Sequence, residues 1–137
     1  MLSLGNVRDD VSKFDEVWVI VRSPGSIRFT GNKKHIPLLS PNKNLFYEYK
    51  RLKDRKMWNS ATFTSRYVPA FLEQMKGAEE QALLKELVTL SRSKNIMLCC
   101  FCADEAMCHR SIVAGILQNM GAIFTPETPD YRKYKIN

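Results

Sequence analysis

The chain has 137 residues, a formal net charge of +7, 45% hydrophobic residues and 26% charged residues. This length suits one domain with its own core, and the composition is ordinary for a soluble globular protein. No apolar run approaches the roughly 18 residues of a membrane span, and residues 1–5 lack a signal-peptide pattern, so we expect no membrane association. The cysteines are clustered rather than spread as a disulfide framework, which favours a reducing, cytoplasmic setting; they are Cys99, Cys100, Cys102 and Cys108.

The positive charge is concentrated in one part of the chain. Residues 22–66 contain eleven Lys and Arg against only Glu48 and Asp54, so the remainder is slightly acidic. Such asymmetry favours a polyanionic partner, either a nucleic acid (DNA ahead of RNA) or a nucleotide, although a solvated basic surface is the plainer interpretation. The candidate nucleic-acid-binding residues are Lys33, Lys34, Lys50, Arg51, Lys53, Arg55 and Lys56.

The first predicted strand is residues 17–21, a continuous apolar and largely β-branched run. A Ser-Pro-Gly-Ser turn follows it and exposes backbone N–H groups. We interpret this turn as an anion-binding loop with four candidate ligand-binding residues, Arg22, Ser23, Ser26 and Arg28. A plain turn is the alternative.

Helices dominate the middle of the chain. After a basic loop at 30–35, Asn42 is positioned to begin a helix with one apolar and one basic face. Pro69 fits the first turn of a helix that ends near Gly77, and residues 78–90 form a clean amphipathic helix. We expect most of the intervening aromatic side chains to be core, with Tyr67 as a candidate ligand-binding residue facing a cleft.

The central unit is a strand, a polar turn and a helix. Residues 96–102 are all apolar or thiol-bearing, which is typical of a strand buried on both faces of a parallel sheet. Helical spacing of Ile112, Val113, Ile116, Leu117 and Met120 predicts the helix. Residues 108–111 would then lie at a helix N-terminus beyond the carboxyl end of a central strand, where ligands bind in α/β sheets.

These elements predict a single three-layer α/β domain with a mainly parallel central sheet flanked by helices. Gly121 is a natural stop for the last helix, and residues 122–124 are expected to add a short edge strand. The domain is therefore assigned to residues 1–124, and residues 125–137 to a mobile basic tail.

The spacing Cys100, seven residues, then Cys108-His109-Arg110-Ser111 resembles the signature of the family catalogued as domain of unknown function 488. The segments Leu39-Ser40-Pro41 with Leu45, and Trp58, Phe63, Arg66 and Tyr67, are similar to that family's middle section. The resemblance implies an α/β fold with the motif in a cleft. It also implies a Glu two residues after the first Cys, where this chain has Cys102; that carboxylate's role is either lost or passes to Asp104 or Glu105.

Four residues around the motif are candidate catalytic groups: Asp104, Glu105, His109 and Arg110. His109 suits acid–base chemistry, and the Arg110 guanidinium suits a phosphate or carboxylate. The alternatives are a buried structural histidine and an ion pair between Arg110 and a neighbouring carboxylate. We expect His109 and Arg110 to act on a ligand rather than to serve as scaffold, and Ser111 to cap the helix or bind phosphate.

The cysteines favour neither of two thiol-based sites. A thiol phosphatase needs five residues between Cys and Arg, whereas seven separate Cys102 from Arg110. Adjacent strand residues such as Cys99 and Cys100 point to opposite faces, and no Cys-x-x-Cys pair is present, which argues against zinc. We therefore expect no metal and no cofactor, with the thiols packing as small hydrophobes.

Three functions remain open. The first is an enzyme acting on nucleic acid or nucleotides, such as a base-excising hydrolase (DNA glycosylase-like) in which Asp104 or Glu105 activates water. The second is a non-catalytic nucleic-acid-binding protein. The third is a small-molecule phosphate-ester enzyme, for which the charge asymmetry is incidental.

Overall fold

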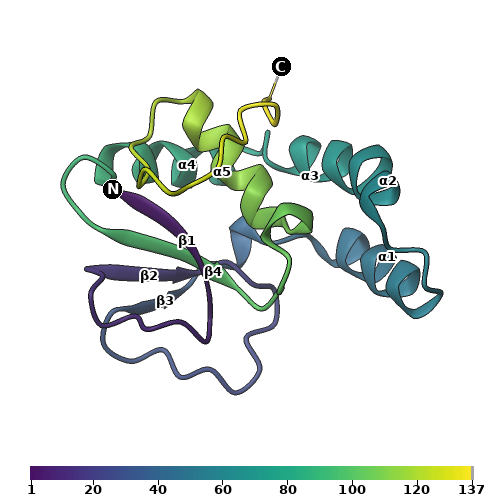
Figure 1. Ribbon diagram of the computed structural model, residues 1–137, viewed down its shortest axis with the longest axis horizontal. Coiled ribbons are helices and arrows are strands. Elements are labelled where there is room, and N and C mark those ends of the chain that lie inside the picture. Colours follow the sequence, from purple (N-terminus) through teal and green to yellow (C-terminus); the bar gives the residue numbers. More distant parts are fainter. Residues whose placement is uncertain (137) are drawn as a thin grey trace.

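A computed structural model describes residues 1–136 of the chain. Four parallel strands form one sheet in the order β1-β4-β2-β3 (Figure 1). Their bounds are Leu2–Asn6 for β1, Glu16–Val19 for β2, Lys33–His35 for β3 and Ile96–Cys100 for β4. The predicted α/β domain built on a parallel sheet is therefore confirmed.

The strand predicted at 96–102 occupies the centre of this sheet as β4. Leu98 pairs with Leu4 on one side and with Trp18 on the other, and every residue of β4 is buried. Burial on both faces requires an uninterrupted apolar strand, which explains its composition. The strand ends at Cys100, so Cys102 lies in the loop that follows.

Helices cover one face of the sheet, and a helical lobe extends past the ends of the strands (Figure 1). α4 (Ala78–Leu90) and α5 (His109–Asn119) pack beside the sheet. The lobe contains α1 (Lys43–Asp54), α2 (Ser60–Thr62), a π-helical turn (Phe63–Tyr67) and α3 (Val68–Gln74). Short 3-10 turns lie at Pro37–Leu39 and Glu105–Met107.

Loops form the layer on the opposite face. Val17, Val19 and Met97 project from the sheet into a second apolar cluster. Side chains from the segments 7–15 and 20–32 cover it, among them Val7, Val11, Phe14 and Ile27. The three layers are thus helices, sheet and loops.

Local signals set the helix boundaries where the sequence predicts them. Asn42 caps α1 by accepting a hydrogen bond from the Leu45 N–H, at 2.9 Å. Pro69 is the second residue of α3, which continues directly from the π-helical turn, so its missing N–H falls where the backbone hydrogen-bond pattern changes from π to α. Gly121 follows α5 with φ of 90°, a left-handed conformation that glycine adopts without strain.

Two strands, β1 and β3, were not predicted from the sequence. β1 is a five-residue strand that contains Ser3 and Gly5, whereas the first strand predicted from the sequence begins at residue 17. β3 is only three residues long and was expected to be a basic loop. Residues 122–124 do add a single bridge, because Phe124 pairs with Leu2 at the outer edge of β1.

The segment after Phe124 packs against α5, contrary to the expectation of a mobile tail. Tyr131 and Tyr134 are both buried. The amide of Asn119 donates to the carbonyl oxygens of Arg132 and Tyr134, at 2.9 and 3.1 Å. Apolar ring area and these hydrogen bonds offset the entropy of ordering the segment, which composition alone did not reveal. Asn137 lies outside the described residues.

Within residues 1–136, no helix combines the length and the apolar character needed to span a membrane.

Candidate functional site

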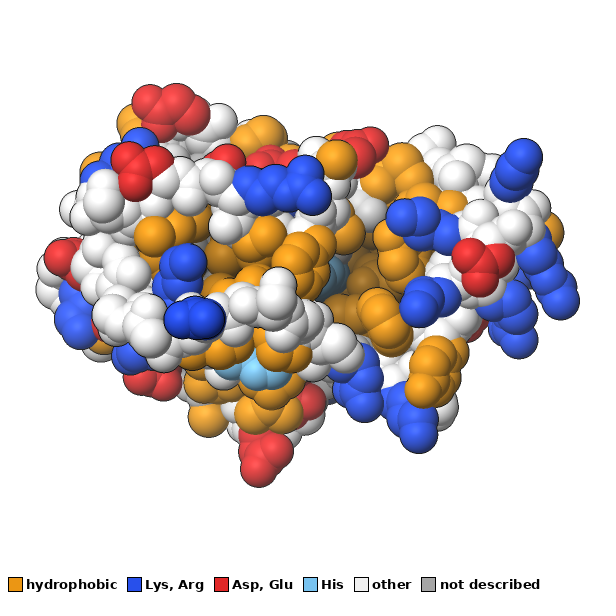
Figure 2. Space-filling model, turned by 90° about the horizontal axis from the view of Figure 1, so that it is seen from below, with side chains coloured by type: hydrophobic (Ala, Val, Ile, Leu, Met, Phe, Trp, Pro, Cys, Tyr) orange, Lys and Arg blue, Asp and Glu red, His pale blue; other side chains and the backbone are white. Residues whose placement is uncertain are grey.

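The end of β4 and the start of α5 form the floor of a cavity of about 170 Å³. Figure 2 shows a hollow with mostly hydrophobic walls on the face seen from below, with Lys and Arg side chains around it. We call this the aromatic cavity; its lining residues are Val21, Arg22, Ser23, Pro41, Phe46, Tyr49, Trp58, Tyr67, Cys100, Phe101, Cys102, Met107, Cys108 and His109. Its position is the strand-end position that the sequence predicted for a ligand.

The walls of the aromatic cavity come from the helical lobe. Tyr49 of α1 and Trp58 pack edge-to-face with ring centroids 4.6 Å apart, and Trp58 and Tyr67 do so at 5.4 Å. Phe46 joins them one turn before Tyr49. The rings hold one another in fixed orientations, so the wall is preformed for a flat apolar ligand.

The rim of the cavity is basic. Arg22 and Ser23 line it from the loop after β2. On the opposite side, the Lys50 ammonium lies 5.7 Å from the centre of the Phe46 ring, and that of Lys53 lies 5.4 Å from the Tyr49 ring. Arg22 and Ser23 of the predicted anion loop therefore line the cavity, and Lys50 and Lys53 of the predicted basic helix lie against two of its wall rings without lining it.

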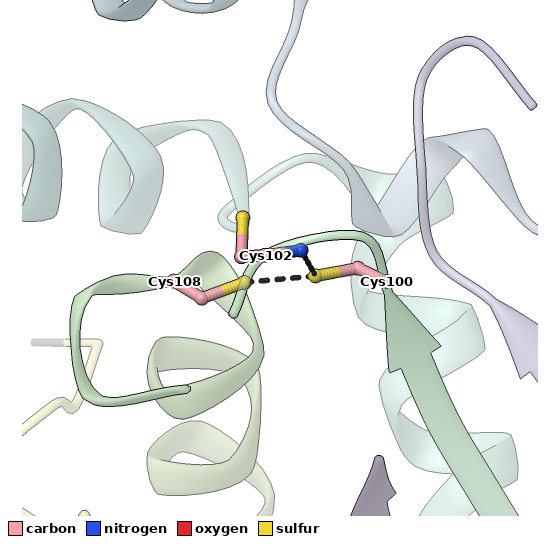
Figure 3. A group of neighbouring side chains, drawn as sticks. All are labelled: Cys100, Cys102 and Cys108. Carbon is pink, nitrogen blue, oxygen red and sulfur yellow. Dashed lines mark hydrogen bonds between the residues drawn. The ribbon is translucent and has the colours of Figure 1, made fainter. Parts of the chain in front are cut away.

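The floor carries three thiols, which we call the thiol cluster: Cys100, Cys102 and Cys108 (Figure 3). Their sulfur atoms all lie within 4.8 Å of one another. Cys100 and Cys108 share a hydrogen bond with the sulfur atoms 2.9 Å apart, and the backbone N–H of Cys102 donates to the Cys100 sulfur at 3.4 Å. The alternation argument separates Cys99 from Cys100, but it does not apply to Cys102 and Cys108, which lie outside the strand.

The surroundings of the three thiols push their pKa values apart. Hydrogen bonds to Cys102 and Cys108, and then burial, raise the pKa of Cys100. Burial also raises that of Cys108, but hydrogen bonds from Cys100 and Cys102 and the charge of Arg110 outweigh it, so the Cys108 pKa is lowered well below its ordinary value. The cluster therefore favours a thiolate at Cys108.

His109 lines the cavity beside this sulfur and is held by a backbone carbonyl. Its Nε2 lies 2.5 Å from the Ile20 oxygen, and because a carbonyl only accepts, Nε2 carries the proton. Nδ1 is then an acceptor, 3.6 Å from the Cys108 sulfur. Burial lowers the pKa of His109, so the ring is neutral. Both ring nitrogens therefore have protein neighbours, the Ile20 carbonyl oxygen at Nε2 and the Cys108 sulfur at Nδ1.

Arg110 is a scaffold residue in this structure, contrary to expectation. Its side chain is buried, and its guanidinium donates to the carbonyl oxygen of Gly5 and, at 2.7 Å, to that of Cys102. Its Nε donates to the Cys108 sulfur at 3.4 Å. A sequence pattern that places an arginine at a helix start cannot distinguish a ligand contact from these internal ones.

Several other predicted site residues lie away from the cavity. Asp104 is exposed and caps the short 3-10 turn, and Glu105 accepts a hydrogen bond from the Tyr131 hydroxyl at 2.7 Å. Ser111 is fully buried, with its hydroxyl donating to the Cys108 carbonyl oxygen. Ser26 and Arg28 are exposed further along the loop. No Asp or Glu among residues 1–136 lines the aromatic cavity.

The predicted basic surface is also divided. Lys33 and Lys34 belong to β3, and Lys34 forms an ion pair with Glu16 at 2.5 Å. Arg51, Arg55 and Lys56 are exposed at the end of α1. Helical spacing puts Arg51 and Arg55 on the side of α1 opposite Phe46. Only Lys50 and Lys53 of this set therefore lie beside the cavity.

A family model described as "Active DUF488-N3 subclade" matches residues 2–121. The chain belongs to the domain of unknown function 488 family. No curated protein and no solved structure matches it. Three residues of the predicted family motif, Cys100, Cys108 and His109, thus line the floor of the aromatic cavity. Arg110 does not line it but contacts the Cys108 sulfur.

In this member of the DUF488 family, Cys102 stands where the family signature was expected to carry a glutamate. This side chain is half-buried and belongs to the thiol cluster. Phe46, Tyr49 and Trp58 also line the cavity, although the sequence did not mark them as candidate site residues. The sequence feature that could have marked them is the alternation of Phe46 and Tyr49 with Lys50 and Lys53 on one helix. Aromatic and basic side chains are commonly combined at nucleic-acid-binding sites.

Proposed function

We propose that this protein is an enzyme that acts on a nucleobase-containing substrate, either a nucleotide or a nucleic acid. The observation that carries the proposal is the aromatic cavity itself, with stacking rings in its walls, basic side chains at its rim and thiol and imidazole groups on its floor. Aromatic side chains stack on bases, and Lys and Arg attract the attached phosphates.

The size of the cavity supports recognition of one base at a time. A cavity of about 150 Å³ admits a benzene-sized ring, and this one has about 170 Å³ and opens to solvent. A base in a duplex would have to be extruded to enter it, as in other enzymes that act on bases. An enclosed reactive floor favours an enzyme over a binding protein that uses only a flat basic face. DNA remains the preferred polymer, and a reducing, cytoplasmic setting suits the free thiols.

Base excision remains the proposed reaction class, but neither Asp104 nor Glu105 is proposed to activate water. Asp104 and Glu105 do not line the cavity, so the candidate groups are those on the floor, above all His109 and the thiol cluster. Tyr67 lines the same cavity and is a candidate for orienting the base. A small phosphate ester without a ring would leave the aromatic walls unused.

Calorimetric titration with nucleoside monophosphates tests the proposal. Arg22→Ala should weaken binding about tenfold, equivalent to about 1.4 kcal/mol, because Arg22 lines the rim. Arg28→Ala is the matched control, since Arg28 is an exposed arginine of the same loop that does not line the cavity. Equal effects of the two substitutions, or equal binding of ribose phosphate without a base, would contradict base recognition.

A further inference from the structure

The thiol cluster has a feature that the proposed function does not use: it gathers three sulfur ligands at one point. Cys100 lies at the end of β4, Cys102 in the following loop and Cys108 immediately before α5. Figure 3 shows the Cys100 and Cys108 sulfur atoms facing each other, with the Cys102 side chain beside them and its sulfur directed away from the pair in this view. Three thiols from separate turns of the chain, all within 4.8 Å of one another, are close enough together to serve as ligands of one metal ion.

We infer that Cys100, Cys102 and Cys108 form a binding site for a thiophilic divalent cation, namely zinc. Zinc binds thiolate sulfur at about 2.3 Å in a tetrahedral arrangement, which places the sulfur atoms about 3.8 Å from one another. In the thiol cluster, the Cys100 and Cys108 sulfur atoms lie 2.9 Å apart, and all three pairs lie within 4.8 Å. The Cys100 and Cys108 sulfur atoms would therefore have to move apart by about 0.9 Å to hold the ion.

The groups around the cluster are those that support a metal thiolate. The Cys102 N–H donates to the Cys100 sulfur, and Nε of Arg110 donates to the Cys108 sulfur, both at 3.4 Å. Such donors stabilise anionic sulfur and orient the ligands. Three thiolates around a doubly charged ion carry one net negative charge, and the buried Arg110 guanidinium compensates it.

The site is open on one side. Among residues 1–136, no fourth Cys, His, Asp or Glu joins the group, and all three cysteines line the aromatic cavity. The remaining tetrahedral position of the ion therefore faces the cavity. Three protein ligands with one open position are typical of catalytic rather than structural zinc.

The inference stands on the thiol geometry alone and holds whatever the substrate is. If the proposed function is also correct, the ion would provide the water activation that the absent carboxylates cannot. A metal test and a nucleotide-binding test therefore succeed or fail separately.

Metal content of protein purified under reducing conditions without chelators is the direct test. We expect one zinc per chain after dialysis, and cobalt(II) in its place should show sulfur-to-metal charge transfer and tetrahedral ligand-field bands. Cys102→Ser should weaken zinc binding more than about 100-fold, because it removes a direct ligand. Cys102 is half-buried in a loop, so this variant should still fold, which circular dichroism verifies.

Cys99→Ser is the control, because Cys99 is a buried cysteine of β4 that lies outside the thiol cluster and the cavity. It should retain one zinc per chain. Fully reduced wild-type protein that holds no zinc at micromolar free metal would overturn the inference. Equal zinc binding by Cys102→Ser and wild type, or equal loss in both cysteine variants, would also overturn it.

Discussion

The Nη2 atom of Arg110 donates a hydrogen bond to the carbonyl oxygen of Cys102, 2.7 Å away. This hydrogen bond connects the N-terminal turn of α5 to the loop that follows β4. The same guanidinium also reaches the carbonyl oxygen of Gly5 at the end of β1. One buried arginine therefore joins the carboxyl end of β1 to the loop after β4, which carries a thiol of the cavity floor.

Arg110→Ala should destabilise the protein by about 2–4 kcal/mol, because it removes the side-chain donor to the buried Gly5 carbonyl oxygen and one of the two donors to the Cys102 carbonyl oxygen, leaving only Asn6 there. Urea denaturation measures this loss. Arg92→Ala, which truncates an exposed arginine, should cost less than about 0.5 kcal/mol. Equal stabilities of the two variants would restore the original expectation that Arg110 faces a ligand.

Replacing both Lys50 and Lys53 by Gln should weaken binding to single-stranded DNA and lower the slope of log affinity against log salt by up to about 1.4, since each lost phosphate contact removes about 0.7. The control is the double replacement of Arg51 and Arg55 by Gln on the opposite side of α1. Filter binding across a salt series gives both slopes. A larger effect from the arginine pair would place the nucleic acid away from the cavity.

Glu16 should make the stability depend on pH below about 5. Hydrogen bonds from Lys34 and Lys94 lower the pKa of this buried carboxyl from 4.5 to about 2. Its contribution is present above pH 4.5 and is lost as the pH falls toward 2, because the unfolded chain takes up the proton first. Both lysines are half-exposed, so we expect about 1–2 kcal/mol. The stability difference between wild type and Glu16→Gln should shrink over this range; a constant difference would show that Glu16 is not the titrating group.

Gly115→Ala should destabilise the protein by about 1–2 kcal/mol. A Cβ atom at this position of α5 would meet the backbone carbonyl of Tyr131, and such overpacking costs more than the roughly 1 kcal/mol gained in helix propensity. Gly77→Ala is the control, because there the neighbouring atoms belong to the flexible end of Glu80. Hydrogen exchange should show faster exchange at residues 131–134 in Gly115→Ala alone. Unchanged protection there would mean that the segment does not depend on α5.

Much of the fold follows from strong periodic patterns in the sequence. β4 and α5 were predictable because a continuous apolar run and a helical stripe each span enough residues to be distinctive. β1 and β3 were not, because short strands with polar residues or glycine are held by their neighbours rather than by their own composition. Lys34, for example, is tied to the sheet by its ion pair with Glu16.

The candidate site was predictable in place but not in detail. The topology rule located it at the end of β4, and Arg22, Ser23, Tyr67 and His109 do line the cavity. The convergence of the thiols was missed because it depends on where β4 ends. A strand continuing to Cys102 would keep strict alternation, whereas a strand ending at Cys100 lets the loop turn Cys102 toward Cys108.

Crystals soaked with a panel of nucleoside monophosphates provide the most direct test of the central claim that the aromatic cavity binds a nucleobase. We predict electron density for a base against Tyr49, Trp58 and Tyr67, with its phosphate toward Arg22 or Lys53. Density for the phosphate alone on the basic surface, with an empty cavity at saturating ligand, would contradict this account.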